Sequence, residues 1–171
     1  IGGDLFAIIW DAEKQELNGL NASGRSPELL TLDYFKENNI TEIPYLGPLP
    51  ITVPGAVDGW FEMHNRYGKL SMNEILEPAI AYAEEGFPVS EVVSWLWKEN
   101  ATSRGIFEGF RNVYMPDGRA PNKGEVFKNP ALASTYKKIG TMGRDEFYKG
   151  DIAKKIDAFM VKNKAFLRYE D

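Results

Sequence analysis

Four prolines between residues 43 and 55 constrain the fold more than any other feature of the sequence. The stretch reads IPYLGPLPITVPG. A proline lacks the backbone N–H and has a fixed φ, so neither a regular helix nor a central strand can run through this segment. We therefore expect an extended loop or an edge strand here, which separates the preceding elements from those that follow.

A β-hairpin is predicted before this proline-rich segment. Residues 5–12 (LFAIIWDA) form a short apolar run with β-branched residues, and residues 16–21 (ELNGLN) alternate partly between apolar and polar side chains. The polar EKQ between the two runs fits a tight turn. Ser26 followed by Pro27 is typical of a helix start, so a helix is expected over residues 27–38.

Helical spacing dominates the chain after residue 55. Terminal glycines, capping residues and apolar periodicity predict helices there, and the ranges are 56–67, 71–86, a short helix after Ser90, 129–143, a brief turn within 143–150, and 151–163. Pro78 lies inside the second of these and should kink it or split it near Glu77. The predicted fold class is therefore α+β, mostly helical with an N-terminal β-hairpin.

Residues 105–127 are rich in turn-forming residues. PDG at 116–118 stands between two short apolar runs. A Pro-Asp-Gly sequence in this position is typical of a turn between strands. We expect an irregular hairpin here.

Composition excludes several classes of function. The chain has no cysteine, which rules out disulfides, thiolate nucleophiles and Cys-type zinc sites. The formal net charge is −5, so the clustered basic face of a nucleic-acid-binding protein is not indicated. No apolar run approaches the roughly 18 residues that span a membrane. His64 is the only histidine, and its place on an apolar helix favours a packing or surface role over that of a general base.

Both ends of the chain read like interior sequence. It opens on Ile1 without a signal-peptide pattern and stops on YED, directly after an amphipathic segment. We therefore expect a piece of a longer polypeptide. Apolar pairs on its helices should then leave an exposed apolar face for the remainder, and these pairs are Trp60/Phe61, Leu76/Ile80 and Leu96/Trp97.

NASGRSP at residues 21–27 contains the candidate binding residue that chemistry singles out. A guanidinium is a rigid fork that matches a carboxylate bidentately, and loops after strands often carry binding residues. Arg25 is therefore a candidate clamp for a substrate carboxylate. A solvated turn residue ahead of a helix is the alternative. Residue pattern leaves both readings open and supplies no complete catalytic set.

Six segments carry a family resemblance. In chain order they are IGGDLFAIIWD (1–11), NASGRSP (21–27), VPGAVDGWFEMHNRYGKL (53–70), EILEPAIAYAEEGFPVS (74–90), GEVFKNPALASTYKKIG (124–140) and GRDEFYKGDIAKKI (143–156). Together they resemble the gamma-glutamyltranspeptidase family, the gamma-glutamyltransferase/glutathione hydrolases with their acylase-like relatives. VPGAVDGW, EPAIAYAEEGFPVS and DEFYKGDIA are highly specific in combination.

The resemblance implies a segment of the large subunit of a precursor that cleaves itself. Residues 1–25 would form a hairpin in the core of an αββα sandwich, typical of an N-terminal-nucleophile hydrolase, and residues 26–171 a helical layer. The nucleophile would be the N-terminal threonine of the small subunit, outside this chain, with its own α-amine as base. The implied reaction is hydrolysis or transfer of γ-glutamyl or related acyl groups from amides such as glutathione. A non-enzymatic helical interaction domain is the alternative.

The resemblance also bears on the substrate carboxylate. Typical transpeptidases bind it with the arginine of an Asp-Phe-Arg-Glu-x-Ala-Pro motif. Aligning the motif's proline with Pro27 places that arginine at Ser23, and Arg25 follows two positions later. The sequence is similar to a subset of the family with Ser-Gly-Arg-x-Pro. Arg25 and Ser23 are thus the expected substrate-binding residues, and no catalytic residue is expected in this chain.

Neither a metal nor an organic cofactor is implied. The expected partners are the remainder of the same precursor, including the small subunit, and a small γ-glutamyl or acyl amide substrate. Nucleic acid is not an expected partner. Periplasmic or secreted and cytoplasmic locations both stay open.

Overall fold

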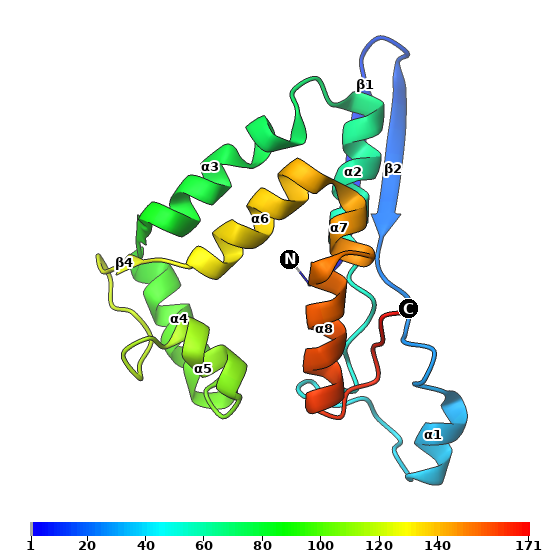
Figure 1. The fold of residues 1–171 in the computed structure, drawn as a ribbon, viewed down its shortest axis with the longest axis vertical. Coiled ribbons are helices and arrows are strands. Elements are labelled where there is room, and N and C mark those ends of the chain that lie inside the picture. Colours follow the sequence, from blue (N-terminus) through cyan, green and yellow to red (C-terminus); the bar gives the residue numbers. More distant parts are fainter. Residues whose placement is uncertain (1) are drawn as a thin grey trace. The chain divides into compact units, whose positions relative to one another are not determined.

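The computed structural model describes residues 2–171. The chain divides into two compact units, Ile1–Leu70 with Met142–Asp171, and Ser71–Thr141. The first contains the N-terminal hairpin and helices from both ends of the chain, and the second is mostly helical (Figure 1). Among residues 2–171, no helix combines the length and the apolar character that crossing a membrane requires.

The predicted N-terminal hairpin is confirmed. Strands β1 (Leu5–Asp11) and β2 (Glu16–Ala22) pair antiparallel, with Leu5 opposite Ala22 and Asp11 opposite Glu16. The Asp11 carboxylate accepts hydrogen bonds from the backbone N–H groups of Glu13 (3.0 Å) and Lys14 (3.1 Å). These bonds close the turn, and the Lys14 N–H is the main reason why the pKa of Asp11 is lowered.

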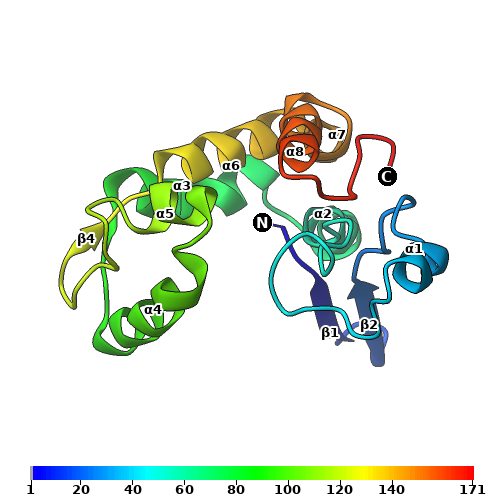
Figure 2. The same cartoon turned by 90° about the horizontal axis from the view of Figure 1, so that it is seen from below.

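Helix α2 (Ala56–Tyr67) lies along one face of the hairpin (Figures 1 and 2). Gly59 permits the close approach, because a Cβ there would lie 2.6 Å from Leu5 Cδ2 and 2.7 Å from Ala22 Cβ. The helix ends at Gly68, as predicted. This packing buries Val57 completely and fixes the strand ends next to the first turn of α2.

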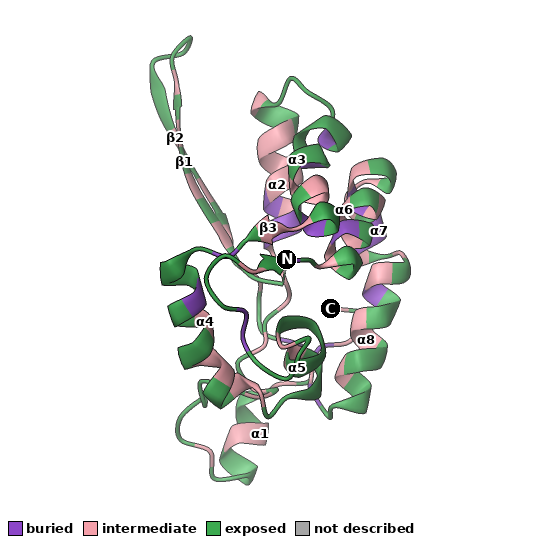
Figure 3. Ribbon diagram, turned by 90° about the vertical axis from the view of Figure 1, so that its left-hand side faces the viewer, coloured by how far each residue is buried: buried purple, intermediate pink, exposed green. Residues whose placement is uncertain are grey.

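The opposite face of the hairpin is apolar and exposed. Because side chains alternate across a strand, the exposed residues of β1 and β2 share the face of the hairpin that does not face α2. Figure 3 colours the exposed positions of the chain green. Their exposed fractions are 67% for Phe6, 79% for Ile8, 56% for Trp10 and 67% for Leu17. Of the helical pairs expected to form the exposed face, Leu96 is exposed, whereas Leu76 is buried. The first unit therefore has an exposed apolar face on its hairpin.

Three further helices complete the first unit, α1 (Leu32–Glu37), α7 (Arg144–Tyr148) and α8 (Asp151–Lys162). Helix α7 contacts both α2 and α8. The predicted helix start at Pro27 is wrong. Pro27 is fully buried, its carbonyl accepts from Leu30 N in a turn (3.0 Å), and Thr31 supplies the cap by accepting from Tyr34 N.

The second unit holds helices α3 (Met72–Glu85), α4 (Glu91–Arg104), α5 (Glu108–Tyr114) and α6 (Pro130–Met142), with the short strands β3 (Phe87–Pro88) and β4 (Val126–Phe127). Helices α3 and α6 lie side by side (Figure 1). Asn129 N donates to Ala83 O at 2.8 Å, and a Cβ at Gly140 would lie 2.4 Å from the Asn73 side chain. Buried Ile139 and Ala133 form part of this unit's core.

Two details of the second unit differ from expectation. Helix α3 runs through Pro78, so the helix is not split near Glu77, and a kink stays a prediction. The predicted capping box of Ser71 and Glu74 forms at its start, and Leu76 and Ala83, on either side of the proline, are buried. The predicted hairpin over 105–127 is wrong. The sequence forms α5, and β4 pairs with the distant β3. PDG is a turn, with Gly118 at φ 72°.

Candidate substrate-binding site

The backbone of the loop that carries Arg25 is in direct contact with the backbone of residues 53–55. A Cβ at Gly24 would lie 1.4 Å from Val53 O, and one at Gly55 would lie 2.1 Å from Ala22 O. Val53 N donates to Arg25 O at 2.9 Å. Glycine is thus required at both positions, since any side chain would separate the two segments. The close approach fixes the backbone from which the Arg25 side chain projects.

Helix α7 anchors the other side of this proline segment. The Tyr148 hydroxyl donates to Pro54 O (2.6 Å) and accepts from Asp58 N (3.0 Å). Partial burial of the ring raises the pKa of Tyr148, so the hydroxyl stays protonated. Arg144 pairs with the Asp58 carboxylate, and its guanidinium carbon lies 4.8 Å from the centre of the Tyr148 ring. The VPG and DEFYKG segments of the sequence therefore meet here.

The Arg25 guanidinium is held at one of its nitrogens. Nη2 donates to the backbone carbonyl of Asp171 at 2.9 Å and lies 3.8 Å from the Asp171 carboxylate. The Arg25 side chain is 53% exposed, whereas that of Asp171 is only 3% exposed. A guanidinium has five N–H donors. An arginine with this exposure can still bind a carboxylate while one nitrogen stays anchored.

Asp171 links this loop to residues 168–171. Its Oδ1 accepts from Glu28 N and its Oδ2 from Arg168 N, both at 2.8 Å. Sequence reasoning did not find this residue, because Arg25 and Asp171 are 146 positions apart and no local pattern joins them.

Ser23 lies in the same loop as Arg25, but local hydrogen bonds hold its side chain. Both Ser23 N (2.9 Å) and Ser23 Oγ (2.7 Å) donate to Asn21 Oδ1. Gly24 N donates to Asp4 Oδ1 at 3.3 Å, which joins the loop to the start of the chain. The two expected binding residues, Ser23 and Arg25, thus lie in one loop, and of the two only Arg25 is charged.

Other polar candidates have structural partners. His64 Nε2 lies 2.6 Å from Leu70 O at the end of α2, a local structural contact for the residue predicted to have a packing or surface role. Thr31 caps α1, and Thr135 Oγ1 donates to Ala131 O within α6 at 3.0 Å. Within residues 2–171, no group of three His, Cys, Asp or Glu side chains is placed to hold a metal ion.

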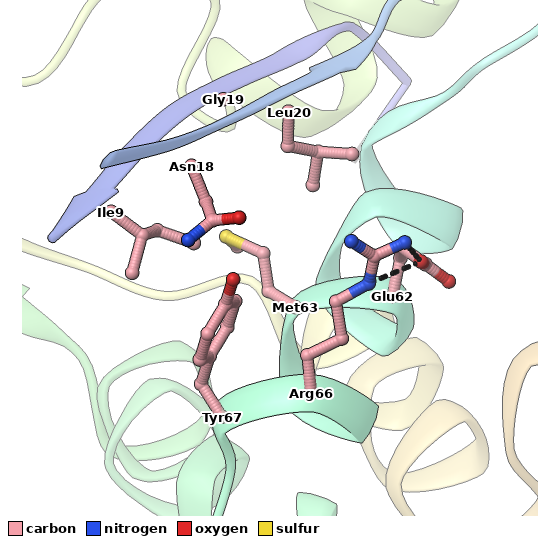
Figure 4. A pocket seen from close by; sticks show the side chains of 8 residues that line it. All are labelled: Ile9, Asn18, Gly19, Leu20, Glu62, Met63, Arg66 and Tyr67. Atoms are coloured by element: carbon pink, nitrogen blue, oxygen red, sulfur yellow. Dashed lines mark hydrogen bonds and ion pairs between the residues drawn. The ribbon is translucent and has the colours of Figure 1, made fainter. Parts of the chain in front are cut away.

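A small pocket lies between the hairpin and α2 (Figure 4). Its volume is about 80 Å³, and its lining includes Asn18, Met63 and Tyr67. Arg66 and Glu62, one turn apart on α2, pair with each other at its edge. Substrate pockets commonly enclose about 300–1,000 Å³. This pocket is thus smaller than a typical substrate pocket.

Comparison with known proteins decides the family. The family model for gamma-glutamyltranspeptidase matches residues 1–171. The chain belongs to this family. It is 34% identical to the glutathione hydrolase-like YwrD proenzyme of Bacillus subtilis, covering 100% of this chain and 32% of that protein. It is 37% identical to a glutathione hydrolase proenzyme of Pseudomonas aeruginosa, covering 99% of this chain and 30% of that protein.

Two solved structures share the fold. Cephalosporin acylase from Bacillus halodurans superposes with a TM-score of 0.94 at 37% identity, over 99% of this chain and 33% of that one. The Helicobacter pylori gamma-glutamyltranspeptidase gives a TM-score of 0.92 at 29% identity, over 100% of this chain and 50% of that one. The chain spans about a third of the length of the curated relatives. The family resemblance predicted from the six sequence segments is confirmed.

Proposed function

We propose that this chain is part of the large subunit of a self-processing gamma-glutamyltranspeptidase-type amidohydrolase. The enzyme hydrolyses or transfers γ-glutamyl or related acyl groups from amides such as glutathione. Its nucleophile is the N-terminal threonine of a small subunit made in the same precursor, activated by its own α-amine. The family match over residues 1–171 carries this proposal.

In this proposal the chain supplies a scaffold and one wall of the substrate pocket. Arg25 binds the α-carboxylate of the γ-glutamyl group through a charge-assisted fork. Its support is the geometry of the loop, in which one nitrogen is anchored on Asp171 O while more than half of the side chain is exposed. Ser23 lies two residues away and offers a hydroxyl without charge.

The remainder of the precursor is the proposed partner of the exposed hairpin face. A two-stranded hairpin is marginally stable by itself, and a large exposed apolar patch indicates an interaction surface. Phe6, Ile8, Trp10 and Leu17 form such a patch on β1 and β2. We infer that further strands and a second sheet of the precursor cover it, which would build the αββα sandwich.

The test uses the full-length precursor that contains these residues. We expect it to cleave itself, to release a small subunit with threonine at its N-terminus, and to liberate nitroaniline from γ-glutamyl-p-nitroanilide. Mass spectrometry identifies the new N-terminus, and absorbance follows turnover. The 171-residue chain alone should be inactive, so turnover by the purified chain would overturn the proposal. A full-length protein that neither cleaves itself nor turns over acyl amides would favour the interaction domain instead.

A further inference from the structure

We infer that Asp171 is a positioning residue for Arg25, an inference that rests on the proposed function. Asp171 is the buried partner of the pair, with 3% of its side chain exposed against 53% for Arg25. Each of its carboxylate oxygens accepts one backbone N–H, from Glu28 and from Arg168, at 2.8 Å. The position of the Asp171 carboxylate is therefore fixed by two backbone segments, independently of Arg25.

The same hydrogen bonds keep the Asp171 carboxylate from occupying the arginine fork. A free aspartate beside an arginine commonly forms a bidentate pair with two short N–H···O bonds. Here the carboxylate stays 3.8 Å from Nη2, and the short contact of 2.9 Å goes to the backbone carbonyl instead. The guanidinium is consequently anchored at one nitrogen while its fork stays available to a substrate carboxylate.

Anchoring matters because arginine is long and loses rotamer freedom when a ligand fixes it. Arg25 is more than half exposed, so few packing contacts restrict it. The hydrogen bond to Asp171 O restricts the side chain in place of packing contacts, and it orients the guanidinium before substrate binds. Loss of the Asp171 carboxylate would release residue 28 and residue 168 together, and with them the carbonyl that holds Nη2.

The discriminating experiment compares two substrates in the full-length enzyme. γ-Glutamyl-p-nitroanilide carries the α-carboxylate, and 4-aminobutyryl-p-nitroanilide lacks it. Asp171→Ala should raise KM for the first substrate about tenfold and leave kcat nearly unchanged, because a disordered clamp weakens ground-state and transition-state binding alike. KM for the carboxylate-free substrate should not change.

Asp157→Ala is the matched control. Asp157 also accepts a backbone N–H from residues 168–171, that of Tyr169 at 3.2 Å. Within residues 2–171, no hydrogen bond described for Asp157 joins it to the Arg25 loop. This variant should leave KM for both substrates unchanged. Asp171→Asn retains one acceptor oxygen for Glu28 N and should give an intermediate KM. It also carries the comparison if the alanine variant does not accumulate as processed enzyme.

A double-mutant cycle separates this inference from the proposed function. Arg25→Ala should raise KM for the carboxylate-bearing substrate, and adding Asp171→Ala should have no further effect, because residues that act as a unit are not additive. If Arg25→Ala leaves KM unchanged, the proposed role of Arg25 fails, and the positioning role fails with it. If only Arg25→Ala raises KM, or if Asp171→Ala impairs both substrates equally, the positioning role alone is overturned.

Discussion

The Tyr148 hydroxyl donates a 2.6 Å hydrogen bond to the carbonyl oxygen of Pro54, which lies 94 residues earlier in the chain. Pro54 follows Val53, the residue whose backbone lies against Gly24 and bonds Arg25. Helix α7 therefore holds residues 53–54 in place, and this segment in turn contacts the backbone of Arg25. This relationship explains why segments far apart in the sequence contribute to one loop.

Replacing Tyr148 by Phe should destabilise the first unit. The change removes the donor to Pro54 O and the acceptor for Asp58 N, and losing such part-buried hydrogen bonds costs about 1–2 kcal/mol. Thermal or urea unfolding of the full-length protein measures the loss. Tyr169→Phe is the control, because that hydroxyl donates to Lys149 O at an exposed site. Equal losses in both variants would contradict a special role for Tyr148.

Gly24→Ala should displace the Arg25 loop. The added Cβ has no space, since it would lie 1.4 Å from Val53 O, and forced overpacking typically costs about 1–3 kcal/mol. We expect lower stability and a higher KM for γ-glutamyl-p-nitroanilide. Gly19→Ala is the matched control, because nothing lies within 4 Å of a Cβ at that position. A Gly24→Ala enzyme with unchanged KM and melting temperature would argue against the close approach.

Acid should weaken the second unit through Glu125. Arg119 pairs bidentately with this carboxylate at 2.9 Å, and Asn122 donates to it from N and Nδ2. These bonds lower the pKa of Glu125 from 4.5 to about 2, with the Arg119 hydrogen bond as the largest cause. A folded-state pKa below the unfolded value stabilises the fold above pH 4.5, and this stabilisation is lost as the pH falls towards 2.

Urea unfolding between pH 2 and pH 5 checks this expectation. Glu125→Gln should flatten the loss of stability over that range. Glu91→Gln, which breaks the exposed pair with Lys123, should leave the acid dependence as it is in the unmodified protein. Parallel acid profiles for Glu125→Gln and the unmodified protein would show that Glu125 is not the group responsible.

Local patterns predicted the elements that local contacts determine. The hairpin, the capping box at Ser71 and the start of α6 at Pro130 each depend on residues close in sequence. Predictions failed where a distant contact prevails. Phe127 pairs with Phe87, and Pro27 is buried in the core and not in a helix.

The candidate site shows the same division. Arg25 could be proposed from its own chemistry within the seven residues NASGRSP and from the family resemblance that the six segments carry together. Its support by Asp171, Val53 and Tyr148 could not, since these contacts arise only when the chain folds. Sequence therefore indicated the charged group but not what orients it.

The decisive measurement for the proposed carboxylate clamp is the selectivity of an Arg25→Ala enzyme for substrates with an α-carboxylate. Removing a clamp of this exposure should cost about 2 kcal/mol of binding, near the lower end for a paired charge at an interface. The kcat/KM for γ-glutamyl-p-nitroanilide should then fall about 30-fold, while that for 4-aminobutyryl-p-nitroanilide stays the same. Arg25→Lys should restore part of the loss, because lysine keeps the charge without the fork. A fall of less than about twofold, below roughly 0.5 kcal/mol, would contradict the clamp and make Arg25 a surface turn residue.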